Sequence, residues 1–381
     1  MLKVMQLVWR FNTGGAERMV INFHKHFKGN KQVDVKTLSF EPKGDGVFEK
    51  ELEEDSSIEY LRPFWGDKCT GIFNKIFRRL FYRKHKEKWL REKILEFSPD
   101  IIHIHLANMA VGMYDFCKKL PKNIKVIYHL HSMPEAIQES WRTVISEAVK
   151  NGVYTPICVT ELQRKSAASY YGVEEDCDIV YNGINQSRFL NYNLSEAEKG
   201  LLKKDLGISE QALVVGCVGR GNEIKNYPLL ASAAGELSEI RETVLLIAGE
   251  IPEELKKIII ANAKSAKVVF LGQRSDTECI YRVMDVFALA SFYESSSIVT
   301  VEAQLSGVPC VISDRISDEV IISDGVCKVS PMSSAKEWAE AIKASIGKPV
   351  VLTDINRFEF KSCAENLLNI YKRLAGLNYD S

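Results

Sequence analysis

The chain has 381 residues, of which 46% are hydrophobic and 26% are charged, and both values are ordinary for a globular protein. Its 50 Lys and Arg residues balance its 50 Asp and Glu residues, which argues against a dedicated nucleic-acid binder, because such proteins usually carry a basic excess. At about 100–200 residues per domain, this length predicts two domains.

The compartment signals predict a cytoplasmic protein. Residues 1–10 lack the long apolar run and the small-residue cleavage site of a signal peptide. No run approaches the ~18 apolar residues that a membrane-spanning helix needs. The nine cysteines are odd in number and scattered, without a C-x-x-C pair, so they indicate neither a zinc site nor a disulfide framework.

Short Val- and Ile-rich runs alternate with stretches of helical length, which is typical of βαβ units and of parallel sheets buried on both faces. The pattern restarts near residue 210, after the polar stretch 182–209. We therefore expect an α/β protein with two Rossmann-like, doubly wound domains that face a ligand cleft at the carboxyl ends of their strands. The expected strands are 4–9, 33–40, 101–105, 126–130, 157–160, 213–218, 243–248, 268–271, 286–289 and 309–312.

Two glycine-containing loops directly follow predicted strands. Gly14 and Gly15 open a helix after the first strand, where free backbone amides can approach an anion. Arg220 and Lys225 lie in the loop 219–226, and such a pair of cations suits a diphosphate. This second loop has no Walker pattern and lacks the third glycine of the dinucleotide fingerprint. Taken alone, each loop is equally compatible with a tight turn that carries solvated charges.

Two glutamates, Glu294 and Glu302, flank the predicted start of a helix near residue 298, and Gly307 fits its C-terminal end. A serine can cap this helix, and Glu302 can accept two ribose hydroxyls, as acidic residues do in other nucleotide sites. The alternative is a surface helix with two solvated glutamates. The residues whose amides we expect to point at an anion are Ser296, Ser297, Ile298 and Val299.

These features occur in an order that resembles one known family, the retaining nucleotide-sugar glycosyltransferases of the GT-B fold, glycosyltransferase family 4 (glycosyl transferases group 1). The resemblance runs from about residue 4 to residue 330. The residues that carry it are Gly14-Gly15, 98–105, 180–185, Gly219-Arg220, Lys225-Asn226, 271–276, Glu294 with Glu302, and 306–309.

For the second domain, the resemblance implies a donor-binding role. Arg220 and Lys225 would neutralise the donor's diphosphate, and Glu302 would bind its ribose. Glu294 would face the donor sugar, together with the backbone of 295–299. The loop that contains Gly272 and Arg274 would lie beside the base.

For the first domain, the resemblance implies the Gly15 amide on the sugar phosphate, with Gly14 as a further donor-binding residue, and a polar His131 near the donor sugar or the acceptor. A hydrogen-bonded core histidine is the alternative for His131. The expected domains are 1–187, which binds the acceptor, and 188–357, which binds the donor, with helix 358–381 packing back on the first. The expected catalytic residues are Glu294, His131, Arg220 and Lys225.

Departures from the family concern the donor sugar and the base. After Glu294 the family has Gly, a bulky residue and Pro, whereas this chain has Ser295-Ser296-Ser297. The family's glycine pair after strand 243–248 is reduced to Gly249-Glu250. These changes bear on which sugar and which base fit.

We expect no metal and no cofactor. The seven histidines all precede residue 132, and the pairs His103/His105 and His129/His131 each share one face of a strand end, but no Cys or carboxylate stands at a ligand spacing. The cations and helix amides can stabilise a leaving diphosphate without a metal. The string Asp176-Cys177-Asp178 reads as a chance match to the DxD motif on a solvated turn.

Residues 61–95 carry 11 basic and 3 acidic side chains, with apolar residues at helical spacing between them. This basic amphipathic pattern suits an anionic membrane surface or an acceptor carried on a lipid diphosphate. An ordinary domain helix that buries its apolar stripe is the alternative. The residues expected on the membrane side are Arg78, Arg79, Arg83 and Lys84.

The function that we expect is metal-independent, retaining transfer of a sugar from a nucleotide-sugar, a UDP-sugar, to a glycan or lipid-linked acceptor in capsular or surface polysaccharide biosynthesis. The protein would be peripheral on the inner face of the membrane and would bind no nucleic acid. Alternatives are a nucleotide-sugar epimerase or hydrolase of the same fold and a non-catalytic, membrane-associated binding protein.

Overall fold

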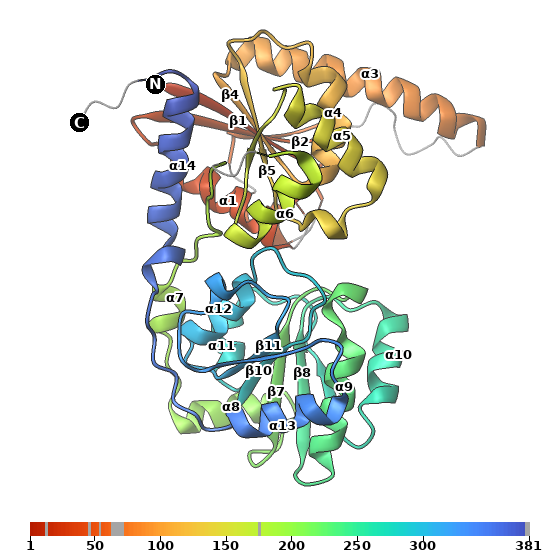
Figure 1. The fold of residues 1–381 in the computed structure, drawn as a ribbon, viewed down its shortest axis with the longest axis vertical. Helices are drawn as coiled ribbons and strands as arrows, with labels where there is room; N and C mark the ends of the chain where they lie inside the picture. The colour runs from red at the N-terminus through yellow and green to blue at the C-terminus, as the bar shows by residue number, and fades with distance from the viewer. Residues whose placement is uncertain (12–13, 45–46, 53–54, 62–71, 174–176, 378–381) are drawn as a thin grey trace. The chain divides into compact units, whose positions relative to one another are not determined.

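The computed structural model describes residues 1–11, 14–44, 47–52, 55–61, 72–173 and 177–377, without the side chains of 47 and 72–83. The chain forms two compact units (Figure 1). The first unit comprises residues 1–180 and 364–381, and the second comprises residues 181–363. Among the described residues, no helix is long and apolar enough to cross a membrane.

The described strands of the first unit form one parallel six-stranded sheet in the order β3-β2-β1-β4-β5-β6. Strand order reverses between β1 and β4, so the loops that follow these two strands diverge at the topological switch point, where ligands bind in open α/β sheets. The strands are β1 (Leu2–Val8), β2 (Val33–Ser39), β3 (Ile58–Tyr60), β4 (Ile101–His105), β5 (Lys125–His129) and β6 (Thr155–Ile157).

Alternation along β4 sends side chains to two different helical layers. Ile102 and Ile104 join a hydrophobic core with residues of α3, α4 and α5, whereas His103 lies on the opposite face, against Tyr371 of α14. The helices of this unit are α1 (Gly15–Phe27), α2 (Val47–Glu51), α3 (Ile72–Phe97), α4 (Ala107–Cys117), α5 (Glu139–Lys150), α6 (Glu161–Tyr171) and most of α14 (Phe360–Leu374).

The second unit repeats this topology, with the strand order β12-β11-β10-β7-β8-β9. Its switch point lies between β7 and β10, which are paired through Val286 and Val215. The strands are β7 (Leu213–Val218), β8 (Thr243–Ala248), β9 (Lys267–Phe270), β10 (Val286–Leu289), β11 (Cys310–Ser313) and β12 (Val326–Val329).

Helices cover both faces of this second sheet, and their ends carry strong local signals. Ser195 and Ser334 each form a capping box with a glutamate three residues later, which fixes the starts of α8 and α13. Trp338 of α13 is completely buried, and its indole N–H donates to the Ser330 carbonyl at 2.9 Å. The helices are α7 (Ser187–Leu190), α8 (Glu196–Asp205), α9 (Tyr227–Ser238), α10 (Glu253–Asn262), α11 (Thr277–Tyr281), α12 (Ile298–Leu305) and α13 (Ala335–Ser345).

The predicted fold class, two doubly wound α/β units, is confirmed. Four strands have the predicted bounds (β4, β7, β8 and β10), and the other predicted strands are displaced by one or a few residues. Two edge strands, β3 and β12, were not predicted. They have only three and four residues and include the charged Glu59 and Lys328, so they lack the apolar run that marked the others.

Candidate active site

Lys225 and Glu294, two predicted site residues, form an ion pair at the switch point of the second unit. Lys225 Nζ lies 2.5 Å from Glu294 Oε1, and each side chain is only 15% exposed. The buried Ser291 donates its hydroxyl to the same carboxylate oxygen at 2.8 Å. The Glu294 carboxylate is therefore held in one orientation by a cation and a hydroxyl.

Backbone contacts bring the two loops that carry this pair together. The Phe292 amide, after β10, donates to the Ile224 carbonyl, after β7, at 2.8 Å. Asn222 caps the short 3-10 turn that ends at Lys225, by accepting the Lys225 amide at 3.2 Å. Asn226 then takes a left-handed conformation (φ 51°), which ends the turn and starts α9.

Glycines allow the loops after β7 and β8 to touch. Gly249 has φ +140°, and a Cβ placed there would lie 2.0 Å from the Gly219 carbonyl oxygen. A Cβ on Gly221 would lie 2.9 Å from the Cα of Ile251, and the Gly221 amide donates to the Glu250 carbonyl at 2.8 Å. Arg220 lies between Gly219 and Gly221, and its side chain is exposed.

The predicted start of α12 at Ile298 is confirmed, and Gly307 follows its end with φ +74°. Ser297 stands at the N-cap position, but its hydroxyl contacts the Thr300 hydroxyl at 2.8 Å and not a backbone amide. The hydroxyl oxygen of Ser296 is buried and has no hydrogen-bond partner among the described residues. Ile298 and Val299 are partly exposed, so the first turn of the helix is accessible.

Glu302 is fixed by a tyrosine that the sequence analysis did not single out. The Tyr281 hydroxyl contacts Glu302 Oε2 at 2.9 Å and the Val299 carbonyl oxygen at 3.1 Å. Burial and the nearby Glu302 carboxylate raise the pKa of Tyr281 well above its usual value, so the hydroxyl stays protonated and can donate. No local motif marks Tyr281, because its partner lies 21 residues away.

The loop after β9 contains the other predicted donor residues. The Gly272 carbonyl accepts the Gly249 amide at 2.7 Å, which joins this loop to the one after β8. Arg274 forms a bidentate pair with Asp276, with N–O distances of 2.8 and 2.6 Å. Arg274 thus already has an anionic partner within its own loop.

In the first unit, Gly14 and Gly15 stand where the sequence predicted, at the start of α1. Gly14 is the N-cap residue and Gly15 is exposed, whereas Asn12 and Thr13 lie outside the described residues. The first turn of α1 follows β1, at the switch point of this sheet, so its amides are placed to meet an anion.

His131 belongs to a cluster of four histidines. His131 Nε2 lies 3.0 Å from His105 Nδ1, and the His129 and His131 ring centroids are 4.5 Å apart. Burial lowers the pKa of His129 to about 3, although the backbone of Val180 opposes the shift. Burial and the neighbouring rings lower the pKa of His103, His105 and His131 well below the usual value, so all four rings are neutral near pH 7.

The basic helix α3 has two different halves. The side chains of Arg78, Arg79 and Arg83 lie outside the described residues, whereas Lys84 is exposed. The C-terminal half is an ordinary packed helix, because Leu90, Ile94 and Phe97 are buried in the core. Lys86 lies 3.7 Å from the Trp9 ring centroid, and burial lowers its pKa to about 8.

Two residues of the DxD-like string, Cys177 and Asp178, make structural contacts. Asp178 pairs with Arg373 of α14, and Cys177 Sγ lies 3.6 Å from Cys158 Sγ. Asp176 lies outside the described residues.

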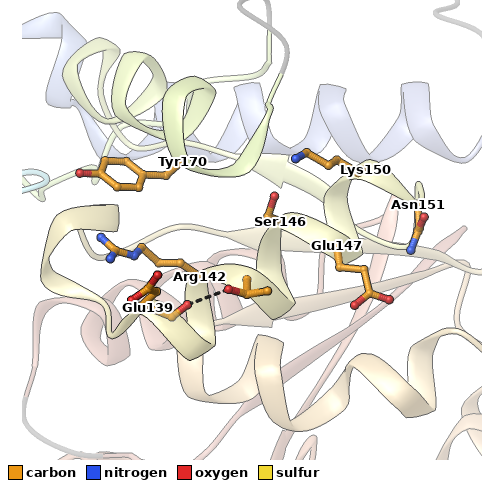
Figure 2. Close-up of a pocket in the computed structure, with 8 residues that line it drawn as sticks. Glu139, Arg142, Ser146, Glu147, Lys150, Asn151 and Tyr170 are labelled. Carbon is orange, nitrogen blue, oxygen red and sulfur yellow. Dashed lines mark hydrogen bonds between the residues drawn. The ribbon is translucent and has the colours of Figure 1, made fainter.

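A hollow of about 620 Å³ lies on the outer helical layer of the first unit, and none of the predicted site residues lines it. Figure 2 shows charged and polar side chains of α5, with Tyr170 of α6, around this hollow. Arg142 stacks on the Tyr170 ring at 4.9 Å. The residues that line the hollow are Glu139, Arg142, Thr143, Ser146, Glu147, Lys150, Asn151 and Tyr170.

Two family profiles match the chain and together cover most of it. The Glycosyltransferase Family 4 profile matches residues 13–188, and the Glycosyl transferases group 1 profile matches residues 212–348. The chain belongs to this family of glycosyltransferases, as the sequence predicted, and it is an enzyme of the transferase class.

Similar proteins agree with this assignment. The putative glycosyltransferase EpsF of Bacillus subtilis is 27% identical over 366 residues, which cover 91% of this chain and 89% of that protein. Among solved structures, HepE of Anabaena, in complex with UDP and glucose, is 20% identical with a TM-score of 0.72, and the alignment covers 99% of this chain and 97% of that one. A glycosyltransferase from Rickettsia africae has the same TM-score and identity over 98% of both chains. The fold is therefore GT-B.

Proposed function

We propose that this enzyme transfers a sugar from a UDP-sugar, and that the donor binds the second unit at the switch point between β7 and β10. The observation that carries the proposal is the Lys225–Glu294 pair, held at 2.5 Å in the same loop region as the exposed Arg220. A cation that is oriented by a carboxylate at the end of a parallel strand suits a phosphate and a sugar hydroxyl side by side. HepE, which shares the fold, has been crystallised with UDP and with UDP-glucose, and this supports the choice of base.

Each part of the donor has a matching group. Lys225 and Arg220 face the diphosphate, and the exposed first turn of α12 adds backbone amides. Glu302 accepts the ribose hydroxyls while the Tyr281 hydroxyl holds its carboxylate in place. Glu294 accepts a hydroxyl of the donor sugar, and the loop of Gly272 and Arg274 borders the base.

Transfer breaks the bond between the sugar's anomeric carbon and the diphosphate, so negative charge grows on the leaving phosphate. Lys225 and Arg220 stabilise that charge electrostatically, and this contribution needs no metal. By family analogy, the acceptor hydroxyl attacks from the face that the diphosphate leaves, and the leaving phosphate takes its proton, so configuration is retained. In the first unit, His131 is the residue proposed to contact the acceptor, which is a glycan or a lipid-diphosphate-linked sugar of a surface or capsular polysaccharide.

Replacing Glu302 with alanine should weaken UDP binding at least about tenfold, because a contact of ~1.4 kcal/mol with the ribose is lost. Isothermal titration of the full chain with UDP, UMP and uridine, followed by turnover with UDP-sugars, measures this. Glu340→Ala is the matched control, since Glu340 is an exposed glutamate on α13.

Two outcomes would contradict the proposal. Unchanged UDP affinity in Glu302→Ala would remove Glu302 from the ribose site. Conversion of the donor without any acceptor, detected by product analysis, would identify an epimerase or a hydrolase of the same fold.

We propose further that the N-terminal half of α3 brings the enzyme to an anionic membrane surface. Figure 1 shows the first turns of this 26-residue helix extending beyond the sheet of the first unit. The segment 61–95 carries 11 basic and 3 acidic side chains, and each basic side chain near an anionic leaflet contributes about 1 kcal/mol.

Changing Arg78, Arg79, Arg83 and Lys84 to glutamate should abolish flotation with vesicles that contain anionic lipid. The matched control changes the exposed Lys31, Lys119, Lys122 and Lys125 to glutamate, which alters the net charge equally. Equal loss of flotation in both variants would indicate a general charge effect, and unchanged flotation in the first would refute a membrane role for α3.

A further inference from the structure

Four histidines from two neighbouring strands meet on one face of the first sheet. The register of β4 and β5 places His105 directly opposite His129, and alternation places His103 and His131 on the same face. The ring centroids of His103 and His105 are 4.0 Å apart, and those of His103 and His129 are 5.3 Å apart. His103, His105 and His129 are completely buried.

In His103 and His105, one ring nitrogen has a hydrogen-bond partner and the other has none among the described residues. His103 Nδ1 lies 2.5 Å from the Tyr371 hydroxyl, and His105 Nδ1 lies 3.0 Å from His131 Nε2. The Nε2 atoms of His103 and His105 are buried without a hydrogen-bond partner among the described residues, and so are both ring nitrogens of His129 apart from a backbone contact with Val180. One nitrogen from each of the three rings lies within 4.8 Å of the other two.

This arrangement is costly unless something occupies the space between the rings. A buried polar atom without a partner destabilises the fold, and several such atoms gather here. His24, another buried histidine of this unit, differs in this respect. Its Nδ1 contacts the Thr37 hydroxyl at 2.8 Å, and its Nε2 contacts the Ser57 hydroxyl at 3.1 Å.

We propose that His103 Nε2, His105 Nε2 and one ring nitrogen of His129 bind a divalent transition-metal ion of the zinc class. Neutral imidazole nitrogen is a preferred ligand of such ions. An ion at the centre of a triangle with 4.8 Å sides lies about 2.8 Å from each corner, so small ring movements reach the usual Zn–N length of about 2.0–2.1 Å.

The outer contacts of the rings support the same assignment. A metal-binding histidine normally donates its second ring N–H to an acceptor, which fixes both the tautomer and the ring orientation. With the metal bound through Nε2, His103 Nδ1–H would donate to the Tyr371 hydroxyl oxygen and His105 Nδ1–H would donate to His131 Nε2. The ion would join β4 to β5 and, through His103 and Tyr371, would anchor α14 on the sheet. This stabilising role does not depend on the proposed donor, and it meets the proposed acceptor site only at His131.

No metal was expected from the sequence, because neither histidine pair has a Cys or a carboxylate at a ligand spacing. The missing information was the register of β4 against β5, which joins the pairs into one cluster.

The test measures metal in the full chain, purified without a polyhistidine tag. Mass spectrometry of the purified protein should find about one equivalent of zinc or a similar ion. Removal of the metal with a chelator should lower Tm by several degrees, and stoichiometric Zn²⁺ should restore it. Co²⁺ added to the stripped protein should give visible d–d absorption, and X-ray absorption of the zinc form should find nitrogen neighbours at about 2.0 Å.

His129→Leu should lose the metal and the Zn²⁺-dependent rise in Tm, whereas the matched control His24→Gln should keep both. The proposal is overturned if the wild-type chain holds no stoichiometric metal and Zn²⁺ leaves its Tm unchanged. It is also overturned if His129→Leu retains the metal. Should His129→Leu not fold, the wild-type metal content and the X-ray absorption measurement still decide the matter.

Discussion

Replacing Lys225 with alanine should lower kcat/KM for sugar transfer by at least about tenfold, which corresponds to ~1.4 kcal/mol of transition-state stabilisation. Two effects act together. The leaving diphosphate loses a cation, and the Glu294 carboxylate, which is only 15% exposed, loses the partner that lies 2.5 Å away. Steady-state kinetics with the donor identified by titration measure the change.

Lys257→Ala is the control for this variant, because Lys257 pairs with Glu254 on the exposed surface of α10 and should leave turnover unchanged. The double variant Lys225→Ala/Glu294→Gln tests whether the two side chains act as a unit. Coupled residues give a combined loss that differs from the sum of the single losses. Wild-type activity in Lys225→Ala would exclude Lys225 from the site.

Replacing Gly249 with alanine should destabilise the second unit by about 3 kcal/mol or more, and it should also abolish donor binding. The new Cβ would meet the Gly219 carbonyl oxygen at 2.0 Å, and the backbone at φ +140° is already unfavourable for a side chain. The loop after β7 would have to move, and with it Arg220 and Lys225. Chemical denaturation and UDP titration measure the two effects.

Gly347→Ala separates steric contact from backbone strain. Gly347 also has a positive φ, +70°, but a Cβ placed there would have no neighbouring atom within 4 Å, so only a strain of about 1–2 kcal/mol is expected. Equal losses of stability in the two variants would mean that the contact between the loops after β7 and β8 contributes nothing.

The strand pattern was sufficient to predict the central strands of both sheets. A strand that is covered on both faces must be apolar along its length, and β7, β8 and β10 satisfy this rule. The strands β3 and β12 escaped prediction because each is short and is interrupted by a charged residue, Glu59 or Lys328, whereas the edge strand β9 was predicted from its apolar run 268–270. The sequence pattern detects an uninterrupted run of apolar residues, and not strand formation itself.

The sequence identified several residues of the candidate site, but it did not predict which of them contact one another. The order of motifs identified Lys225 and Glu294, yet these residues are 69 positions apart, and their ion pair depends on β7 lying next to β10. Tyr281 carries no motif at all, although it holds Glu302. Contacts between loops follow from strand order and register, which a linear pattern does not contain.

The assignment of α14 to the first unit has a consequence for biosynthesis. The ribosome makes the sheet of that unit early, but Tyr371, which covers His103, emerges only after the whole of the second unit. At about 5–20 residues per second, residues 181–363 take about 10–40 s to translate. During that interval His103 lacks its Tyr371 partner, whereas His129 can already pack against Phe23 of α1. In a nascent chain the His103 ring therefore lacks the hydroxyl that orients it until α14 packs on the sheet.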